Sequence, residues 1–237
     1  MRMPGPLPAF GPAYGGGGVP APAVPEGSLL FTGDWETGDT SQWEAVQCIE
    51  SRISAVASPV AQGAYAGKFE IRDAEKLPGG DARAEVAWGV QLAAEGAEWV
   101  YDWHSMFDES FPTIPGKWQV ITQFKSNDAN TPPLKFEVDG DTLKLMGGPQ
   151  VEWAVLHSFT FPRGVWMHFR VRAKWSENPA VGWVSLWVDD VLEVDQYAMA
   201  NLYEDTGNYF KMGLYRDDTI TQTGIVYHDG LTIRDVA

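Results

Sequence analysis

The sequence predicts an all-β protein built as a sandwich of two antiparallel sheets. Three observations support this fold class. Apolar and polar residues alternate in many short segments, aromatic residues make up 13% of the chain, and 25 Gly and 16 Pro punctuate it. No long segment shows an apolar period of about 3.6 residues, so helices should be few. A chain of 237 residues, 44% of them hydrophobic, can bury one large core.

The first 27 residues differ in composition from the rest. They contain seven Pro and seven Gly but only two charged side chains, Arg2 and Glu26. This composition cannot form a core, so an extended arm is expected over 1–27 and a β-jelly roll over 28–237. Two interpretations of the arm stay open: a segment that docks the protein on a larger assembly, or a linker.

Period-two alternation then predicts the strands in order. Ser28 to Phe31 begins the domain, and alternating segments follow at 68–72, 83–88, 119–125, 168–175, 209–215 and 225–233. Two hairpins are expected, one turning at Asp139-Gly140 and one at Asp189-Asp190. Strands of this length and spacing are typical of a sandwich or jelly roll.

Charge restricts the partners. The chain has 17 Lys and Arg against 32 Asp and Glu, a net charge of -15 that repels nucleic acids and anionic membranes. No apolar run is long enough for a transmembrane helix, and the N-terminus lacks the apolar stretch of a secretory signal. The single Cys48 excludes an intrachain disulfide and a cysteine-based zinc site.

Four segments resemble the jelly-roll polysaccharide lyases, which include alginate, glucuronan and heparin lyase-like groups. Residues 209–216, Tyr-Phe-Lys-Met-Gly-Leu-Tyr-Arg, resemble the YFKxGxY signature of that family. Residues 83–86 resemble its R-x-E strand, 118–125 its strand ending in Gln-x-His, and 226–233 the closing strand of its heparin lyase-like members. The resemblance spans about 29–235 and implies a concanavalin-like jelly roll whose concave sheet forms a glycan groove.

The resemblance also implies catalytic roles. Such lyases break a uronate polymer by β-elimination, which requires neutralisation of the substrate carboxylate, a base for the C5 proton and an acid for the leaving oxygen. By resemblance, Tyr215 is the base and acid, Gln123 and Arg83 neutralise the carboxylate, and Lys211 is a cation of the groove. One departure weakens the comparison: this chain has Lys125 where the family has His.

Alternation supports part of this geometry. Tyr209, Lys211 and Tyr215 share one strand face, and Gln119, Gln123 and Lys125 share another, so both faces are expected to line one cleft. Purely structural roles stay open as well, with Tyr215 a half-exposed strand tyrosine and with Lys211 and Arg83 paired to glutamates. Glu85 is expected to pair with a cation.

The remaining ligand-binding candidates are Lys125, Tyr209, His104, Arg170 and Arg172. Lys125 is suited to binding a carboxylate, but an amine with a pKa near 10.4 is a poor base at neutral pH. His104 lies on an expected strand close to 119–125, where it would replace the missing histidine. Arg170 and Arg172 belong to a cationic stripe that either attracts an anionic ligand or pairs with neighbouring carboxylates.

No cofactor is expected, and no transition-metal site is predicted from the histidine spacing. Calcium is left open only by the turn carboxylates at Asp189-Asp190 and Asp217-Asp218.

Two functions follow from different classes. In the first, the protein is a glycan-binding or structural jelly roll displayed on a larger assembly, such as the surface of a phage virion, through its arm. In the second, it is an active polysaccharide lyase that acts outside the cell. Lys125 and the absence of an export signal favour the first, while the intact YFKxGxY signature favours the second. In both, the expected partner is an anionic polysaccharide or cell-surface glycan.

Overall fold

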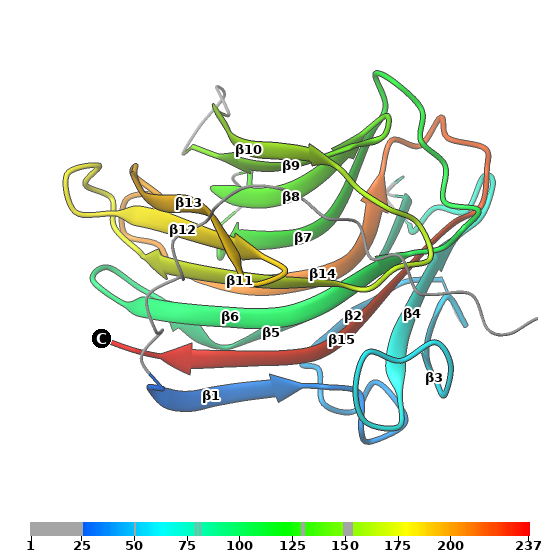
Figure 1. Cartoon of the computed structure of the whole chain (residues 1–237), viewed down its shortest axis with the longest axis horizontal. Coiled ribbons are helices and arrows are strands. Elements are labelled where there is room, and N and C mark those ends of the chain that lie inside the picture. The colour runs from blue at the N-terminus through cyan, green and yellow to red at the C-terminus, as the bar shows by residue number, and fades with distance from the viewer. Residues whose placement is uncertain (1–25, 50, 79, 81, 129–130, 149–153) are drawn as a thin grey trace, which may run out of the picture.

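A computed structural model describes residues 26–49, 51–78, 80, 82–128, 131–148 and 154–237. Within these ranges the regular structure is entirely β, in two antiparallel sheets that pack face to face (Figure 1). The predicted all-β jelly-roll sandwich is therefore confirmed. Among the described residues there is no helix long and apolar enough to span a membrane. Apart from Glu26 and Gly27, the predicted docking arm over 1–27 lies outside the described residues and stays a prediction.

The eight-stranded sheet has the order β13-β12-β11-β6-β15-β4-β3, with β1 also paired to β15. Its strands are β1 (Ser28–Gly33), β3 (Ile53–Val56), β4 (Ala66–Ile71), β6 (Glu98–Phe107), β11 (Met167–Lys174), β12 (Trp183–Val188), β13 (Val191–Ala198) and β15 (Gly224–Asp235). The last strand of the chain, β15, thus lies in the middle of this sheet, between β6 and β4.

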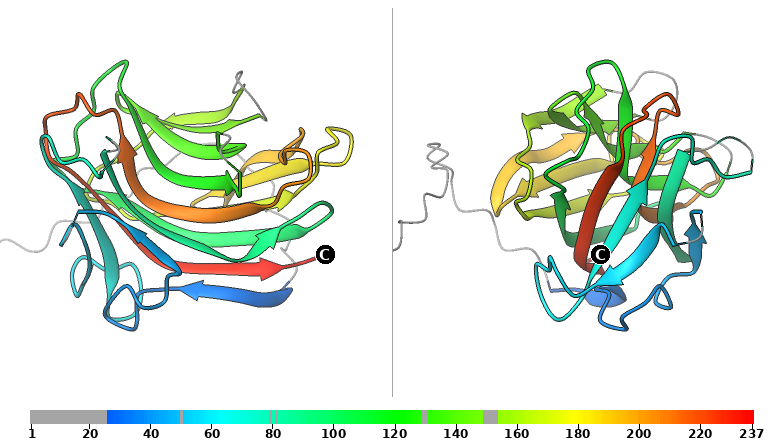
Figure 2. Two further views of the ribbon diagram at one scale, coloured as in Figure 1. Left: turned by 180° about the vertical axis from the view of Figure 1, so that it is seen from behind. Right: turned by 90° about the vertical axis from the view of Figure 1, so that its right-hand side faces the viewer.

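The seven-stranded sheet has the order β10-β9-β8-β7-β14-β5-β2. Its strands are β2 (Ala45–Gln47), β5 (Ala82–Ala93), β7 (Trp118–Ser126), β8 (Leu134–Asp139), β9 (Thr142–Gly147), β10 (Ala154–Thr160) and β14 (Asn208–Arg216). Here too a late strand is central, because β14 lies between β7 and β5. The strands of this sheet are strongly bent, as the rear view in Figure 2 shows.

Both predicted hairpins form. Gly140 joins β8 to β9 with a φ of 62°, and Asp189 and Asp190 join β12 to β13 with φ of 49° and 63°. At Asp189-Asp190, two successive residues in the left-handed region give the turn that matches the right-handed twist of paired strands. The turn residues in the sequence therefore mark where each pair of strands reverses direction, while the register of β12 against β13 shifts between Val184 and Trp187.

Aromatic side chains fill the space between the sheets. Tyr101 of β6 stacks on Phe210 of β14, with ring centroids 5.5 Å apart, and so links the two layers directly. Trp103 of β6 stacks on Phe169 and meets Phe136 edge-on. These rings are almost fully buried. Because alternate residues of each strand point inward, the other half of each strand is free to carry polar side chains on the outer faces.

Candidate functional site

The four predicted catalytic residues lie together on the outer face of the seven-stranded sheet. They come from three adjacent strands, β5, β14 and β7. Arg83 of β5 is the register partner of Tyr215 of β14, and Lys211 of β14 is the partner of Gln123 of β7. Residues far apart in the sequence thus meet on one surface, which we call the polar face.

Glu85 of β5 is the centre of the polar face. Its carboxylate is 1% exposed and receives Lys211 Nζ at 2.7 Å, Arg83 Nη1 at 3.0 Å and a hydrogen bond from Gln123 Nε2. A buried carboxylate is stable only when charge and donors surround it, as they do here. The expected pairing of Glu85 with a cation is confirmed, and it holds three predicted site residues in fixed positions.

Gln47 completes this network and was not predicted. Its Oε1 accepts hydrogen bonds from Lys211 Nζ at 2.8 Å and from Arg83 Nη1 at 3.3 Å. Gln47 lies on β2, a strand of only three residues that pairs with β5. So short a strand has no alternation to read, and the sequence therefore carried no signal for it.

Tyr215 is enclosed by two side chains of the polar face. The Arg83 guanidinium lies 4.1 Å from the Tyr215 ring centroid, and the Trp118 ring meets Tyr215 edge-on at 4.8 Å. Sequence alternation suggested Gln119 for this face, and that expectation was wrong. The register of β7 against β8 shifts between Val120 and Thr122, so Gln119 is fully buried and donates to the Pro112 carbonyl at 2.7 Å.

Lys125 and Tyr209 form the next register pair on the polar face. Lys125 Nζ donates to the backbone carbonyls of Ser126 and Asp128, at 3.1 and 2.9 Å. Burial lowers the pKa of Lys125, the Asp128 carboxylate opposes this shift, and the neighbouring cations Lys211 and Arg83 add to it. Burial raises the pKa of Tyr209, and the Glu85 charge adds to this rise.

The central part of the polar face is rich in positive charge. On β5, β14 and β7, Arg83 and Lys211 share the Glu85 carboxylate, and Lys125 lies close enough to both cations to be influenced by their charge, with the Asp128 carboxylate opposing their effect. Beside them on β8, the buried Lys135 is the register partner of Gln123 and is paired with Glu137 at 2.5 Å. In a chain with a net charge of -15, this local excess of cations is the feature that favours an anionic ligand.

His104 is not part of the polar face, which corrects the prediction that it replaces the missing histidine. It lies on β6, in the other sheet, where its ring stacks on His168 with centroids 4.7 Å apart. Burial lowers the pKa of His104, and the neighbouring His168 contributes to the same shift. Alternation in the sequence shows which residues share a strand face but not which sheet the strand joins.

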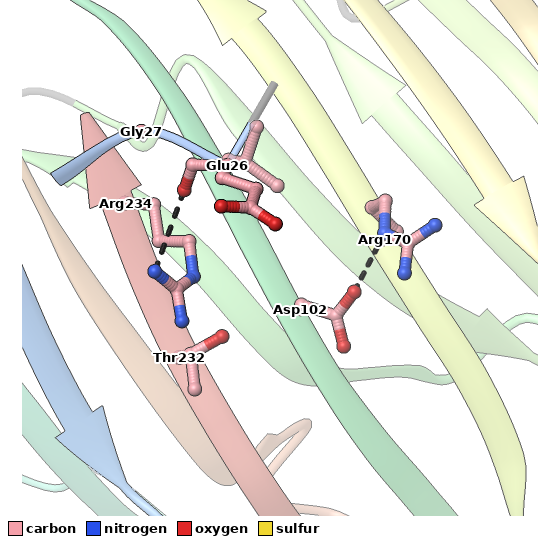
Figure 3. Close-up of a pocket in the computed structure, with 7 residues that line it drawn as sticks. Glu26, Gly27, Asp102, Arg170, Thr232 and Arg234 are labelled. Atoms are coloured by element: carbon pink, nitrogen blue, oxygen red, sulfur yellow. Dashed lines mark hydrogen bonds and ion pairs between the residues drawn. The ribbon is translucent and has the colours of Figure 1, made fainter. Parts of the chain in front are cut away.

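Arg170 and Arg172 also lie on the outer face of the eight-stranded sheet, away from the polar face. Arg170 Nε donates to Asp102 at 2.6 Å, and Arg172 Nε donates to Glu98 at 2.8 Å. The sequence left two interpretations of the cationic stripe open, an anionic ligand or pairing with neighbouring carboxylates. The structure provides the carboxylate partners that pairing requires. A hollow of about 470 Å³ lies beside this stripe. Figure 3 shows residues that line it, with Asp102 of β6 between Arg170 of β11 and Arg234 of β15.

The described residues contain no cluster of three or more His, Cys, Asp and Glu side chains placed to hold a metal ion. The turn aspartates left open for calcium have other bonds. Asp189 accepts the His168 backbone N–H at 2.8 Å, and Asp217 accepts the Thr219 backbone N–H at 2.9 Å.

Comparison with known proteins places this geometry in context. The solved endo-β-1,4-glucuronan lyase from the fungus Trichoderma reesei has 19% identity, with 88% of this chain and 98% of that chain covered and a TM-score of 0.71. The family 7 alginate lyase A1-II' has 12% identity over 79% of this chain and 84% of that chain, with a TM-score of 0.60. An alginate lyase from Corynebacterium sp. has 14% identity over 80% and 83%, with a TM-score of 0.55.

These likenesses, at low identity, show a shared fold. No curated protein matches the chain by sequence. The sequence pattern of the family described as polysaccharide lyase, however, matches residues 35–232, which include the whole polar face described above. The chain therefore belongs to the polysaccharide lyase family.

Proposed function

We propose that this protein binds a uronate-containing polysaccharide along the polar face of its seven-stranded sheet. The observation that carries the proposal is the gathering of Arg83, Lys125 and Lys211 on one face, where Arg83 and Lys211 share the Glu85 carboxylate, in a chain that is otherwise strongly acidic. Solved structures with the same fold are named as lyases of glucuronan and alginate, both of which are polymers of uronate sugars.

Each side chain has a distinct contribution to such binding. Arg83 and Lys125 are partly exposed, so their charges can meet the carboxylates of successive sugar units. Trp118 and Tyr209 are half-buried aromatics that offer an apolar surface to a sugar ring. Lys211 is 2% exposed and acts mainly by adding positive potential beneath the surface.

Cleavage of the bound polymer is the second candidate function, and the position of Tyr215 favours it. Its ring lies against Arg83, and Lys211 and Gln123 lie on the same face. In β-elimination, Tyr215 as the phenolate would remove the C5 proton, the electron pair would form the C4–C5 double bond, and the C4–O bond would break. The neutral tyrosine would then give that proton to the leaving oxygen and return to the phenolate, so the protons balance.

Two features favour binding over cleavage as the function of the polar face. The Gln123 amide and the Lys211 ammonium, which would neutralise a substrate carboxylate, already bind Glu85. Lys125, in the position of the family histidine, is bound to two backbone carbonyls. Substrate binding would therefore have to compete with bonds inside the protein.

Binding and cleavage are separable in one experiment. We would measure equilibrium binding of polyglucuronate, alginate and a neutral glucan, and follow the far-ultraviolet absorbance of unsaturated products in the same samples. Uronate polymers should bind, more weakly as salt rises, and the neutral glucan should not.

The matched pair of variants is Lys125→Gln, on the polar face, and Lys68→Gln, on β4 of the other sheet, whose partner Glu70 is at 2.7 Å. We expect Lys125→Gln to weaken uronate binding and Lys68→Gln to leave it nearly unchanged. Equal binding of charged and neutral polymers, or no binding of either, contradicts the proposal.

A further inference from the structure

Gly213 lies at the point where β14 departs from regular pairing. The register of β14 against β7 shifts between Met212 and Tyr215, while pairing with β5 continues without a shift from Phe210 to Arg216. The φ of Gly213 is 141°, and a Cβ built there would lie 2.2 Å from the Ala84 carbonyl oxygen. Only glycine fits this position, midway between Lys211 and Tyr215 of the polar face.

The carbonyl of Gly213 is held from the interior of the sandwich. It accepts a hydrogen bond from Nε2 of His228, on β15 of the opposite sheet, at 3.1 Å. His228 is completely buried, and its Nδ1 lies 2.9 Å from the Ser105 hydroxyl. Ser105 in turn accepts the indole N–H of Trp103 at 3.0 Å. A chain of hydrogen bonds thus crosses the core from one sheet to the other.

Donor and acceptor roles in this chain are fixed by chemistry. A carbonyl oxygen only accepts, so His228 Nε2 must carry a proton. The Ser105 oxygen accepts from Trp103, and its hydroxyl proton is then directed to His228 Nδ1, which accepts as the unprotonated nitrogen of a neutral ring. Burial lowers the pKa of His228 to about 4, so this neutral form persists at physiological pH.

We propose that His228 is a positioning residue of the polar face: by holding the Gly213 carbonyl in the interior, it maintains the irregularity of β14 that places Lys211 and Tyr215 over Glu85 and Arg83. Its relevance to binding or cleavage rests on the function proposed above. Without the His228 donor, the buried Gly213 carbonyl has no replacement donor in this hydrogen-bond chain. Strand β14 would then be stabilised by a movement toward regular pairing with β7, which restores a hydrogen bond to that carbonyl. Such a movement displaces the two flanking site residues.

Three variants test this role. His228→Phe keeps a flat ring against Phe69, which meets the imidazole edge-on at 5.2 Å, but has no donor. His228→Gln keeps an N–H donor near the position of Nε2. Val226→Ala is the control, because Val226 is a fully buried residue of the same strand that takes no part in the hydrogen-bond chain.

We would record backbone amide NMR shifts of Lys211 and Tyr215, thermal stability, and affinity for polyglucuronate. His228→Phe should move both amides further than Val226→Ala does and weaken binding about tenfold or more. His228→Gln should regain most of the affinity. A His228→Phe protein with unchanged site amides and unchanged affinity overturns the proposal.

Nitrogen-15 NMR of the imidazole in the unaltered protein gives a test that needs no variant. The proposal requires a proton on Nε2 and none on Nδ1, and the reverse tautomer contradicts it. If His228→Phe does not fold, this spectrum and the His228→Gln amides decide. If the unaltered protein binds no uronate polymer, the proposed function fails, while the amide shifts still decide whether His228 positions the face.

Discussion

The Arg83 guanidinium lies over the ring of Tyr215, 4.1 Å from its centroid, and the two residues are direct register partners on β5 and β14. Arg83 also donates to Glu85 at 3.0 Å, so one side chain joins the buried carboxylate to the aromatic ring. The guanidinium is thereby fixed at two places, and the tyrosine is held against a permanent positive charge.

Tyr215→Phe should separate chemistry from binding. The substitution keeps the ring contacts with Arg83 and Trp118 and removes only the hydroxyl. If the protein cleaves uronate polymers, product formation should fall to background while affinity stays close to that of the unaltered protein, as measured by absorbance and calorimetry. Tyr209→Phe, on the same strand face, is the control and should retain turnover. Undiminished cleavage by Tyr215→Phe would exclude it as the acid and base.

Lys125→His tests the departure from the family pattern. A histidine has an ordinary pKa near 6.5 and can exchange protons at neutral pH, whereas the Lys125 ammonium is bound to two backbone carbonyls. We expect the variant to form unsaturated product faster than the unaltered protein. Lys125→Gln, which cannot exchange protons, should show no gain. Equal rates for all three proteins would mean that residue 125 does not limit the reaction.

Glu85→Ala should destabilise the fold strongly. The substitution leaves Lys211, 2% exposed, without its carboxylate, and removing one partner of a buried ion pair costs about 3 kcal/mol or more. Urea unfolding measures the change. Lys144→Ala, which breaks the more exposed pair with Asp139, should cost less than about 1 kcal/mol. Similar losses for both variants would show that the Glu85 network contributes little.

Gly213→Ala should be among the most damaging single changes. It combines a left-handed φ of 141° with a backbone atom 2.2 Å from the new Cβ, so we expect a loss of about 3 kcal/mol or more. Gly96→Ala is the matched control. Gly96 has a φ of 81° but no atom within 4 Å of its added Cβ, so conformational strain alone should cost about 1 kcal/mol. Comparable urea unfolding midpoints for Gly213→Ala and Gly96→Ala would contradict the close approach of the added Cβ to the Ala84 carbonyl oxygen.

Stability should fall in acid because of His228. The unfolded chain takes up this proton near pH 6.5, whereas burial keeps the folded imidazole neutral down to about pH 4. The contribution of His228 to the free energy of unfolding is therefore complete above pH 6.5. It decreases by roughly 3 kcal/mol as the pH drops to about 4, and it changes no further below that. The difference between the unaltered protein and His228→Gln, measured by urea unfolding across this range, isolates the effect. Parallel curves for the two proteins would contradict it.

Much of the fold was predictable because alternation and turn chemistry are local. The Asp139-Gly140 and Asp189-Asp190 turns fixed their hairpins, and period two placed Lys211 and Tyr215 on one face. The convergence of Arg83 and Gln123 with them came from the resemblance to a family, since no local pattern states that β5 and β7 flank β14.

The wrong or missing predictions concern residues whose position is determined by the strands that pair with their own strand. His104 alternates as well as any groove residue, yet β6 joins the opposite sheet. Gln119 was turned inward by a register shift that depends on β8 and β14, and Gln47 entered through pairing of a three-residue strand. Each case depends on long-range pairing, which a single sequence does not encode locally.

The central positions of β14 and β15 have a consequence for how the chain folds. Each sheet is completed by a strand inserted between two strands that lie roughly 80 residues or more earlier in the chain, so each layer is complete only when its own late strand, β14 or β15, has arrived. Until then β5 and β7, and likewise β4 and β6, present unpaired edges to other molecules. Assembly should accordingly be slow and dominated by non-local encounters, and misassociation during refolding should be most frequent before these two insertions.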